Sequence, residues 1–93
     1  MPKPNKLYVM LLEIITPDQK VFSGEVKLLQ VPGLDGSFEI MHKHAPVISI
    51  IGKGQVKVIT QSDEKQYFEI EGGVVEMKNN NIILLAEHLV RKE

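Results

Sequence analysis

The chain contains no cysteine and few aromatic residues, and these absences exclude several kinds of chemistry. Without cysteine there is no disulfide, no thiolate nucleophile and no zinc site built on thiolates. Only two tyrosines and three phenylalanines could stack against bases, in a chain whose net charge is −1. Because nucleic-acid binding depends on concentrated positive charge, and the lysines here are scattered among glutamates, no nucleic-acid partner is expected.

The length of 93 residues is enough for one domain and too short for two. A domain of this size buries only about 60–65% of the surface that its unfolded chain exposes, so its core is thin. A deep substrate cavity is therefore hard to sustain. The apolar run from Leu7 to Ile15 is interrupted by Glu13, is too short for a membrane span and is followed by no signal-peptide cleavage site.

Hydrophobic periodicity predicts strands over almost the whole chain. The predicted strands cover residues 7–15, 19–23, 25–31, 55–60, 67–71, 74–77 and 82–86. Turn signals such as Pro17-Asp18 recur about every 8–12 residues, which is typical of an all-β sandwich or barrel with antiparallel strands. The run 82–86 is apolar on both faces and predicts a strand covered on each side. Only residues 86–93 could begin a helix, and so short a helix is marginal in water.

The densest chemistry lies in residues 33–46, which include two of the three histidines. His42 and His44 are two positions apart, so on a strand they would project from the same face and could begin a metal site. Glu39 or His88 could complete it. Zinc sites need three or four ligands at coherent spacing, however, and only a pair is visible. A surface histidine pair is favoured, and a metal-binding or metal-dependent β domain using His42, His44 and Glu39 is the alternative.

Other catalytic patterns are missing from the sequence. No serine lies in a nucleophile elbow, no glycine-rich phosphate loop is present, and no pair of carboxylates is marked as opposed. The segment Gly52-Lys53-Gly54 is better explained as a tight turn. We therefore expect no catalytic residue, no metal and no cofactor.

The glycines within residues 33–46 favour a different role for this segment, as a shaped loop. Gly33 and Gly36 bracket Leu34 and Asp35, which predicts a tight, exposed loop with an apolar residue at its tip. Apolar residues on rigid loops often contact other proteins, although Leu34 could also fold back onto the sandwich. The segment His44 to Pro46 is a rigid corner. The pattern favours an interaction module without naming its partner.

A series of short motifs resembles the epsilon subunit of F-type ATP synthases, which is called delta in mitochondria. The motifs are Val21-Phe22-Ser23-Gly24, Val31 with Gly33 and Gly36, His44-Ala45-Pro46, Gly54, Gly72-Gly73 before Val74-Val75-Glu76, and Leu85-Ala86-Glu87. Their order and spacing are specific, and the match runs from Leu7 to Leu89. The resemblance implies a flattened sandwich of two antiparallel sheets in residues 7–89, between a flexible segment 1–6 and a C-terminal tail 90–93.

The resemblance also implies a function. It implies a non-catalytic rotor subunit of a proton- or sodium-driven ATP synthase, which couples the gamma subunit to the ring of c subunits. The partners would then be gamma and the c-ring. The chain would be peripheral to the cytoplasmic face of the bacterial plasma (inner) membrane through the complex, without inserting into lipid.

Two contact regions follow from the resemblance by position. The implied c-ring contacts are Gly33, Leu34, Asp35, Gly36, Ser37 and Phe38. The implied gamma contacts are Thr16, His44, Ala45 and Ser49. This sequence departs from the family pattern at Glu39 and at His42-Lys43, where relatives often have a glycine and a Pro-Gly pair, and at Ser37, where an acidic residue is common.

Many members of the family continue into a C-terminal helical hairpin that can inhibit ATP hydrolysis and in some binds ATP. The present chain ends at Glu93, where that hairpin would begin. A naturally short version and a truncated one are both compatible with the sequence. Hairpin inhibition and ATP binding are expected to be absent from this chain.

Overall fold

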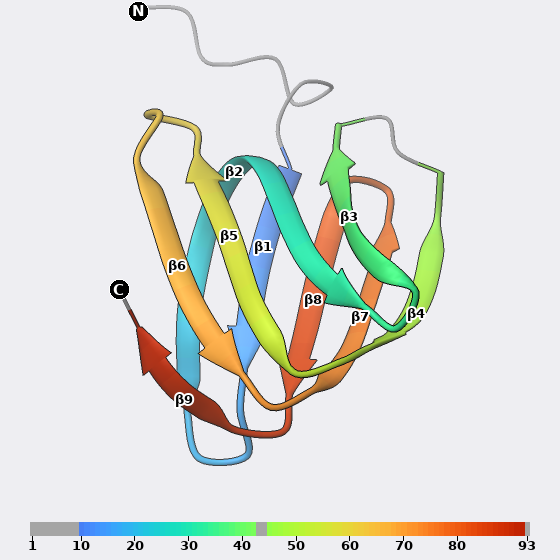
Figure 1. Ribbon diagram of the computed structural model, residues 1–93. Helices are drawn as coiled ribbons and strands as arrows, with labels where there is room; N and C mark the ends of the chain where they lie inside the picture. Colours follow the sequence, from blue (N-terminus) through green and yellow to red (C-terminus); the bar gives the residue numbers. More distant parts are fainter. Residues whose placement is uncertain (1–9, 43–44, 93) are drawn as a thin grey trace, which may run out of the picture.

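A computed structural model describes residues 10–42 and 45–92, and within them it contains nine strands and no helix (Figure 1). None of these residues therefore forms a helix long and apolar enough to cross a membrane. The strands are β1 (Met10–Ile15), β2 (Lys20–Gly33), β3 (Gly36–Met41), β4 (Val47–Ile51), β5 (Gly54–Thr60), β6 (Lys65–Ile70), β7 (Gly73–Lys78), β8 (Asn81–Ala86) and β9 (Leu89–Lys92). The all-β prediction is confirmed.

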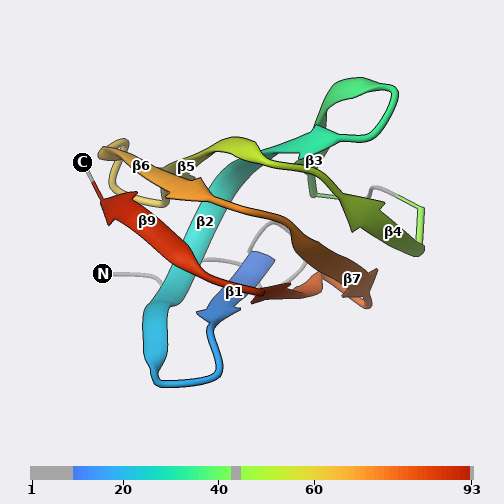
Figure 2. The ribbon, with the colours of Figure 1, turned by 60° about the horizontal axis from the view of Figure 1, so that its bottom comes forward.

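The strands form two layers joined by the long strand β2 (Figures 1 and 2). One layer has the order β1-β8-β7-β4, and the other contains β5, β6 and β9. The first half of β2 pairs with β1, and its second half pairs with β5 and β3. The register with β5 shifts between Val26 and Leu28, where β2 passes from one layer to the other. Because β2 belongs to both layers, it closes the sandwich along one side.

One pairing departs from the antiparallel pattern. β1 and β8 pair in parallel, with Leu12 opposite Ile82 and Ile14 opposite Leu84, while the other pairings among the described strands are antiparallel. Parallel neighbours need a long connection, and most of the chain lies between these two strands. The N-terminal and C-terminal thirds of the sequence thus meet in one layer.

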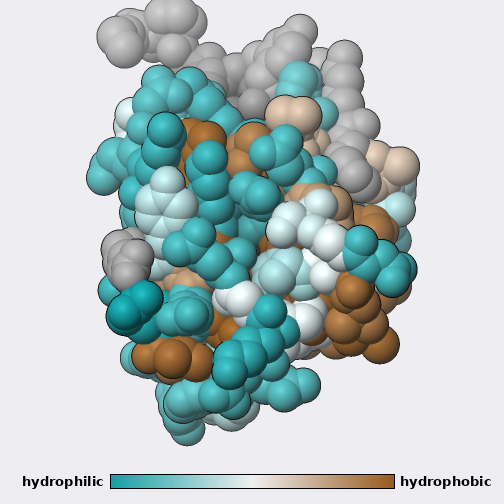
Figure 3. Space-filling view, in the orientation of Figure 1, coloured by the Kyte–Doolittle hydropathy of each residue, from teal (hydrophilic) through white to brown (hydrophobic). Residues whose placement is uncertain are grey.

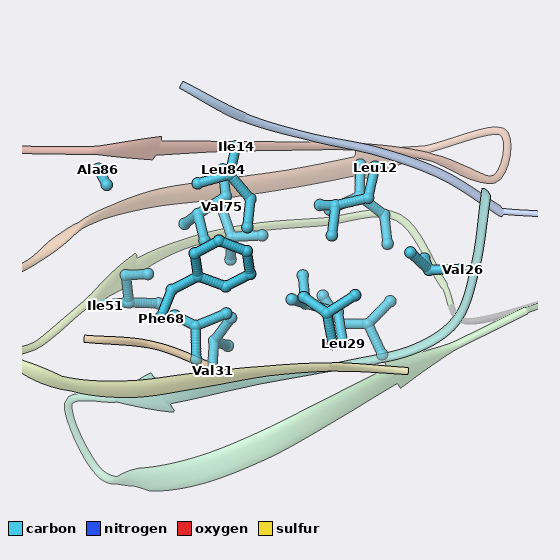
Figure 4. Close-up of a cluster of buried hydrophobic side chains, with 14 of the residues drawn as sticks. Leu12, Ile14, Val26, Leu29, Val31, Ile51, Phe68, Val75, Leu84 and Ala86 are labelled. Atoms are coloured by element: carbon cyan, nitrogen blue, oxygen red, sulfur yellow. The ribbon is translucent and has the colours of Figure 1, made fainter. Parts of the chain in front are cut away.

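The core lies between the two layers and is made of aliphatic side chains around one aromatic ring (Figure 4). Phe68 is fully buried, with Leu84 and Val75 contributed from the opposite layer. The Phe22 ring meets the Phe68 ring edge to face, with 6.0 Å between the ring centroids. The strict alternation of buried and exposed residues in β7 and β8 shows why these segments form strands.

The prediction of a strand covered on both faces at 82–86 is wrong. Ile82 and Leu84 are buried, but the side chain of Leu85 is 51% exposed and that of Ile83 is 38% exposed. Only one interior exists between the two layers, so each strand buries one face. The outward face of β8 is apolar, and the described residues do not cover it.

The expected start of a helix at 86–93 is also wrong. Residues Leu89–Lys92 form β9, which pairs with β6 so that Arg91 lies opposite Glu69, with 3.5 Å between Nη2 and Oε2. The open edge of β6 offers this segment backbone partners that an isolated two-turn helix lacks, and tertiary pairing overrides local preference. Sheet structure thus extends to Lys92, beyond residue 89, where the sequence analysis ends the domain. The segment predicted to be flexible, residues 1–6, lies outside the described residues.

The contact between β7 and β8 depends on Gly73. A Cβ built on Gly73 would overlap with the carbonyl oxygen of Leu85, so any larger residue must push the two strands apart. We predict that Gly73→Ala lowers the free energy of unfolding by about 2–3 kcal/mol, measured by chemical denaturation. Gly24→Ala is the matched control, because its Cβ would lie 3.5 Å from the Phe22 ring, an ordinary contact. Equal stability of the two variants would contradict this account.

Candidate interaction surfaces

The glycine-bracketed loop predicted from the sequence is the tip of the β2–β3 hairpin. Gly33 pairs with Gly36, which leaves Leu34 and Asp35 as a two-residue turn. Leu34 and Asp35 keep negative φ, and the residue directly after them, Gly36, has a φ of 123°, which favours glycine. The hairpin projects beyond the rest of the domain, as Figure 2 shows. The structure therefore has the tight, exposed loop that the glycine spacing predicts.

The tip end of the hairpin is held by the connection between β4 and β5. The amide of Gly52 donates a hydrogen bond to the carbonyl oxygen of Pro32, with 2.7 Å between N and O. Leu34 lies beside the same connection, since a Cβ built on Gly52 would be 3.4 Å from its Cδ2. The Leu34 side chain nevertheless stays 69% exposed. The Leu34 side chain lies against the β4–β5 connection but is not covered by it, so it is accessible to a partner protein.

The six residues implied as c-ring contacts divide into two groups. Leu34, Asp35, Gly36 and Ser37 are exposed. Gly33 and Phe38 are only partly exposed, and Phe38 packs against the core. In the face drawn in Figure 3, which is mostly hydrophilic, hydrophobic atoms gather at the lower right, where Figure 1 places this end of the molecule.

Among the implied gamma contacts that the structure describes, Thr16 lies apart from Ala45 and Ser49. Thr16 is buried at the end of β1, whereas Ser49 lies in β4, and β8 and β7 separate these two strands. Ala45 is exposed just before β4, and His44 lies outside the described residues. The hydroxyl of Ser49 donates to the carbonyl oxygen of Ile50 over 3.3 Å.

Thr16 has a clear structural role. Its backbone amide and its hydroxyl both donate to the carbonyl oxygen of Gln19, over 2.9 Å and 3.2 Å, and so close the turn between β1 and β2. Thr16 and Pro17 also border a shallow hollow together with Val74 and Leu85. Thr16 therefore fixes the backbone at this end of the surface, while its own side chain is largely buried.

The surface that spans the distance from Thr16 to Ser49 is the outer face of the layer β1-β8-β7-β4. Register aligns its side chains in rows, one of which runs from Ile50 through Val74 and Leu85 to Ile15. The large exposed aliphatic residues of this face are Ile48 (73%), Ile50 (64%), Leu85 (51%), Leu11 (49%), Ile83 (38%) and Val74 (37%). The neighbouring row is mixed, since it runs from Ile48 through Glu76 and Ile83 to Glu13. An exposed apolar row bordered by charged residues marks a protein interaction site.

Sequence reasoning missed this apolar face. Its signal was present in β4 and β8, whose residues are apolar at nearly every position. A domain with a single thin core cannot bury both faces of such strands. The prediction that residues 82–86 are covered on both faces left no apolar side chains for an exposed face.

The proposed metal ligands do not converge in the described part of the structure. Within residues 10–42 and 45–92, no three His, Cys, Asp or Glu side chains are placed to hold a metal ion. Glu39 is exposed on β3, His42 is partly exposed just after it, and His88 is exposed between β8 and β9. His44 lies outside the described residues. Nothing in this arrangement supports the metal-binding alternative.

The architecture and its surfaces define a class: a small β-sandwich domain with a projecting hairpin and an apolar sheet face suited to binding other proteins. The chain belongs to the family of the ATP synthase delta/epsilon chain β-sandwich domain, whose family model matches residues 9–92.

Two curated relatives carry the same family name. The ATP synthase epsilon chain of Chlorobium limicola is 43% identical over 76 residues, which are 82% of this chain and 86% of the relative. The ATP synthase epsilon chain of Maridesulfovibrio salexigens is 41% identical over 78 residues, or 84% of this chain. The match covers only 54% of that second relative.

Solved structures share the fold at low sequence identity. A chain in the mitochondrial ATP synthase of Euglena gracilis, solved with OSCP, F1 and the c-ring, matches with a TM-score of 0.85 and 14% identity. The match covers 97% of this chain and 57% of that one. A chain from the central stalk and c-ring of the Tetrahymena thermophila mitochondrial enzyme matches with a TM-score of 0.74 and 21% identity, covering 95% and 68%.

The structural role of Thr16 can be separated from any role in binding. We predict that Thr16→Val, which keeps the shape but removes the hydroxyl donor, lowers the free energy of unfolding by about 1 kcal/mol. Thr16→Ser retains the hydroxyl and should preserve the hydrogen bond to Gln19. Denaturation of both variants measures the difference. Unchanged stability of the valine variant would show that the hydroxyl does not hold the turn.

Proposed function

We propose that this chain is a non-catalytic rotor subunit of an ATP synthase, which couples the gamma subunit to the c-ring in the central stalk. Membership of the delta/epsilon family supports the proposal, as do relatives named epsilon chain. Structures that share its fold come from ATP synthase assemblies that include the c-ring. The subunit would work without a cofactor, in a complex driven by protons or sodium ions.

The location follows from the same proposal. As a subunit of a membrane-bound complex, the chain would be peripheral to the cytoplasmic face of the bacterial plasma (inner) membrane. The complex would hold it there, without insertion of its own residues into lipid.

The observation that carries the proposal is the apolar outer face of the layer β1-β8-β7-β4. A coupling subunit must transmit torque, so it needs a broad contact that resists rotation as well as a second contact at some distance. The aliphatic residues of this face supply the broad contact, which we assign to gamma. Thr16 lies at one end of the face, and Ala45 and Ser49 lie at or beside the β4 end.

The second contact is the tip of the β2–β3 hairpin, which we assign to the c-ring. Leu34 and Asp35 project at the end of a hairpin anchored through Gly52 and Pro32. A two-residue turn has little freedom to bend, so a force applied at the tip passes into β2 and the sheet. The combination of one apolar and one acidic tip residue suits the polar loops of a ring subunit.

The apolar face can be tested by introducing charge in its apolar row, where Leu85 lies between Val74 and Ile15. We predict that Leu85→Glu weakens binding to the gamma subunit of the same organism at least tenfold, because the carboxylate would be desolvated in the contact. Isothermal titration calorimetry measures the affinity. Val90→Glu is the matched control, since Val90 is similarly exposed, at 48%, but lies on β9 in the other layer.

Binding of the Leu85→Glu variant with unchanged affinity, while its unfolding curve matches the unsubstituted chain, would remove this face from the gamma contact.

The hairpin tip is tested by Leu34→Asp. Because Leu34 is 69% exposed, the substitution should leave the stability within about 0.5 kcal/mol. We predict that a complex reconstituted with this variant retains gamma but loses the c-ring more readily during purification. Proton-driven ATP synthesis should fall in proportion. Full retention of the c-ring with normal coupled synthesis would contradict the assignment, and Val90→Asp controls for added charge elsewhere.

A further inference from the structure

The outer face of the layer β1-β8-β7-β4 carries two carboxylates among its aliphatic side chains. Glu76 of β7 lies between Ile48 of β4 and Ile83 of β8. Glu13 of β1 lies next to Ile83 on its other side. The side chain of Ile48 is 73% exposed and that of Ile83 is 38% exposed. Because Glu76 lies between these two isoleucines, a partner that covers both of them also covers its carboxylate.

The two carboxylates differ in how their charge is balanced. The Glu13 carboxylate forms an ion pair with the Lys20 ammonium, with 2.6 Å between Oε2 and Nζ. Within residues 10–42 and 45–92, no ion pair includes Glu76. A carboxylate that loses its water without gaining a partner is costly, so a protein that docks here has to compensate the charge of Glu76.

A shallow hollow lies beside Glu76 on the β4 side. Its lining residues are Pro46, Val47, Ile48, Glu76, Met77 and Lys78. A long basic side chain suits this hollow, because its methylene stem would pack against Pro46 and Ile48 while its charged end meets the carboxylate. Lys78 is exposed at the end of β7, so its own ammonium stays in water.

The chemistry of the missing partner group follows from the charge of Glu76. An aliphatic side chain placed against it would leave the carboxylate desolvated and unpaired, and a second carboxylate would add repulsion. A guanidinium or an ammonium instead forms a charge-assisted hydrogen bond with it. Charge complementarity therefore requires a cation at this point of the partner surface.

We propose that Glu76 is a specificity-determining residue of the gamma contact and forms an ion pair with an arginine or lysine of gamma that lies beside Ile48. The proposal rests on the proposed function, because it takes gamma to be the protein that covers this face. The apolar row through Leu85 supplies contact area that accepts many apolar surfaces. Glu76 accepts those that present a cation and rejects those that present a carboxylate or an aliphatic group in its place.

The direction in which Glu76→Gln changes the affinity tests the proposal. The substitution keeps the shape of the side chain and removes its charge. We predict that it weakens binding to the gamma subunit of the same organism about tenfold in isothermal titration calorimetry, because the gamma cation loses its partner. Glu76→Lys should weaken binding about a hundredfold, because two cations are then opposed. Unchanged or tighter binding of the glutamine variant would overturn the proposal, since neutralising a carboxylate that has no cation beside it costs nothing.

Charge reversal on gamma identifies the partner residue. Each exposed arginine and lysine of gamma is changed in turn to glutamate, and each gamma variant is titrated with the Glu76→Lys chain. One of them should bind that chain at least tenfold more tightly than unsubstituted gamma does, because opposite charges face each other again. The same gamma variant should bind the unsubstituted chain more weakly. A complete set without a restoring variant would rule out the ion pair.

Two further variants separate a failure of this proposal from a failure of the proposed function. Glu69→Gln removes the same charge from β6 in the other layer and should leave the affinity for gamma unchanged. Leu85→Glu tests the apolar row independently of Glu76. Affinity lost with Leu85→Glu but kept with Glu76→Gln would retain the gamma contact and overturn the ion pair. A chain that does not bind gamma at all would overturn both, and unfolding curves establish that each variant is folded.

Discussion

Each strand of this small domain can bury only one of its faces, and the rest of the structure depends on that constraint. The two layers enclose a single core around Phe68, so every inward side chain contributes to one interior. Residues 10–42 and 45–92 form no third layer that could cover the outside. Apolar residues beyond those needed for the core must therefore face outward, and here they lie on the layer β1-β8-β7-β4. An uncovered apolar sheet is costly for a protein that acts alone and useful for one that works in an assembly.

Close contacts join the β2–β3 hairpin to the sheet that carries it. β2 runs through both layers and ends in the hairpin whose tip carries Leu34 and Asp35, so the tip is continuous with the longest strand of the fold. The amide of Gly52 bonds to the carbonyl oxygen of Pro32, next to the turn, and ties this end of the hairpin to the β4–β5 connection. The absence of a side chain at Gly73 lets β7 and β8 approach closely in register. These features suit a part that passes a force from one contact to another rather than a part that changes shape.

Local sequence patterns predicted the fold class and the shape of the exposed loop well. Alternation and turn residues act over a few positions, so they indicated strands and the turn between Gly33 and Gly36 without knowledge of the rest. The same reasoning failed at residues 86–93, where pairing with β6 decides the conformation, and at Ile82 to Ala86, where the number of layers decides what is covered. The family resemblance implied gamma contacts at Thr16 and Ser49, and these residues lie toward opposite ends of the layer β1-β8-β7-β4.

By itself the sequence determined that this protein is an all-β domain of the ATP synthase epsilon type, with a glycine-bracketed hairpin and no pattern of catalytic residues. Those properties depend on residue types and short spacings, which are local. Only the tertiary structure decided that β1 pairs in parallel with β8 and that a row of apolar side chains crosses four strands. These properties arise from pairings between distant segments, and the free energy of such pairings depends on which neighbours the whole fold brings together.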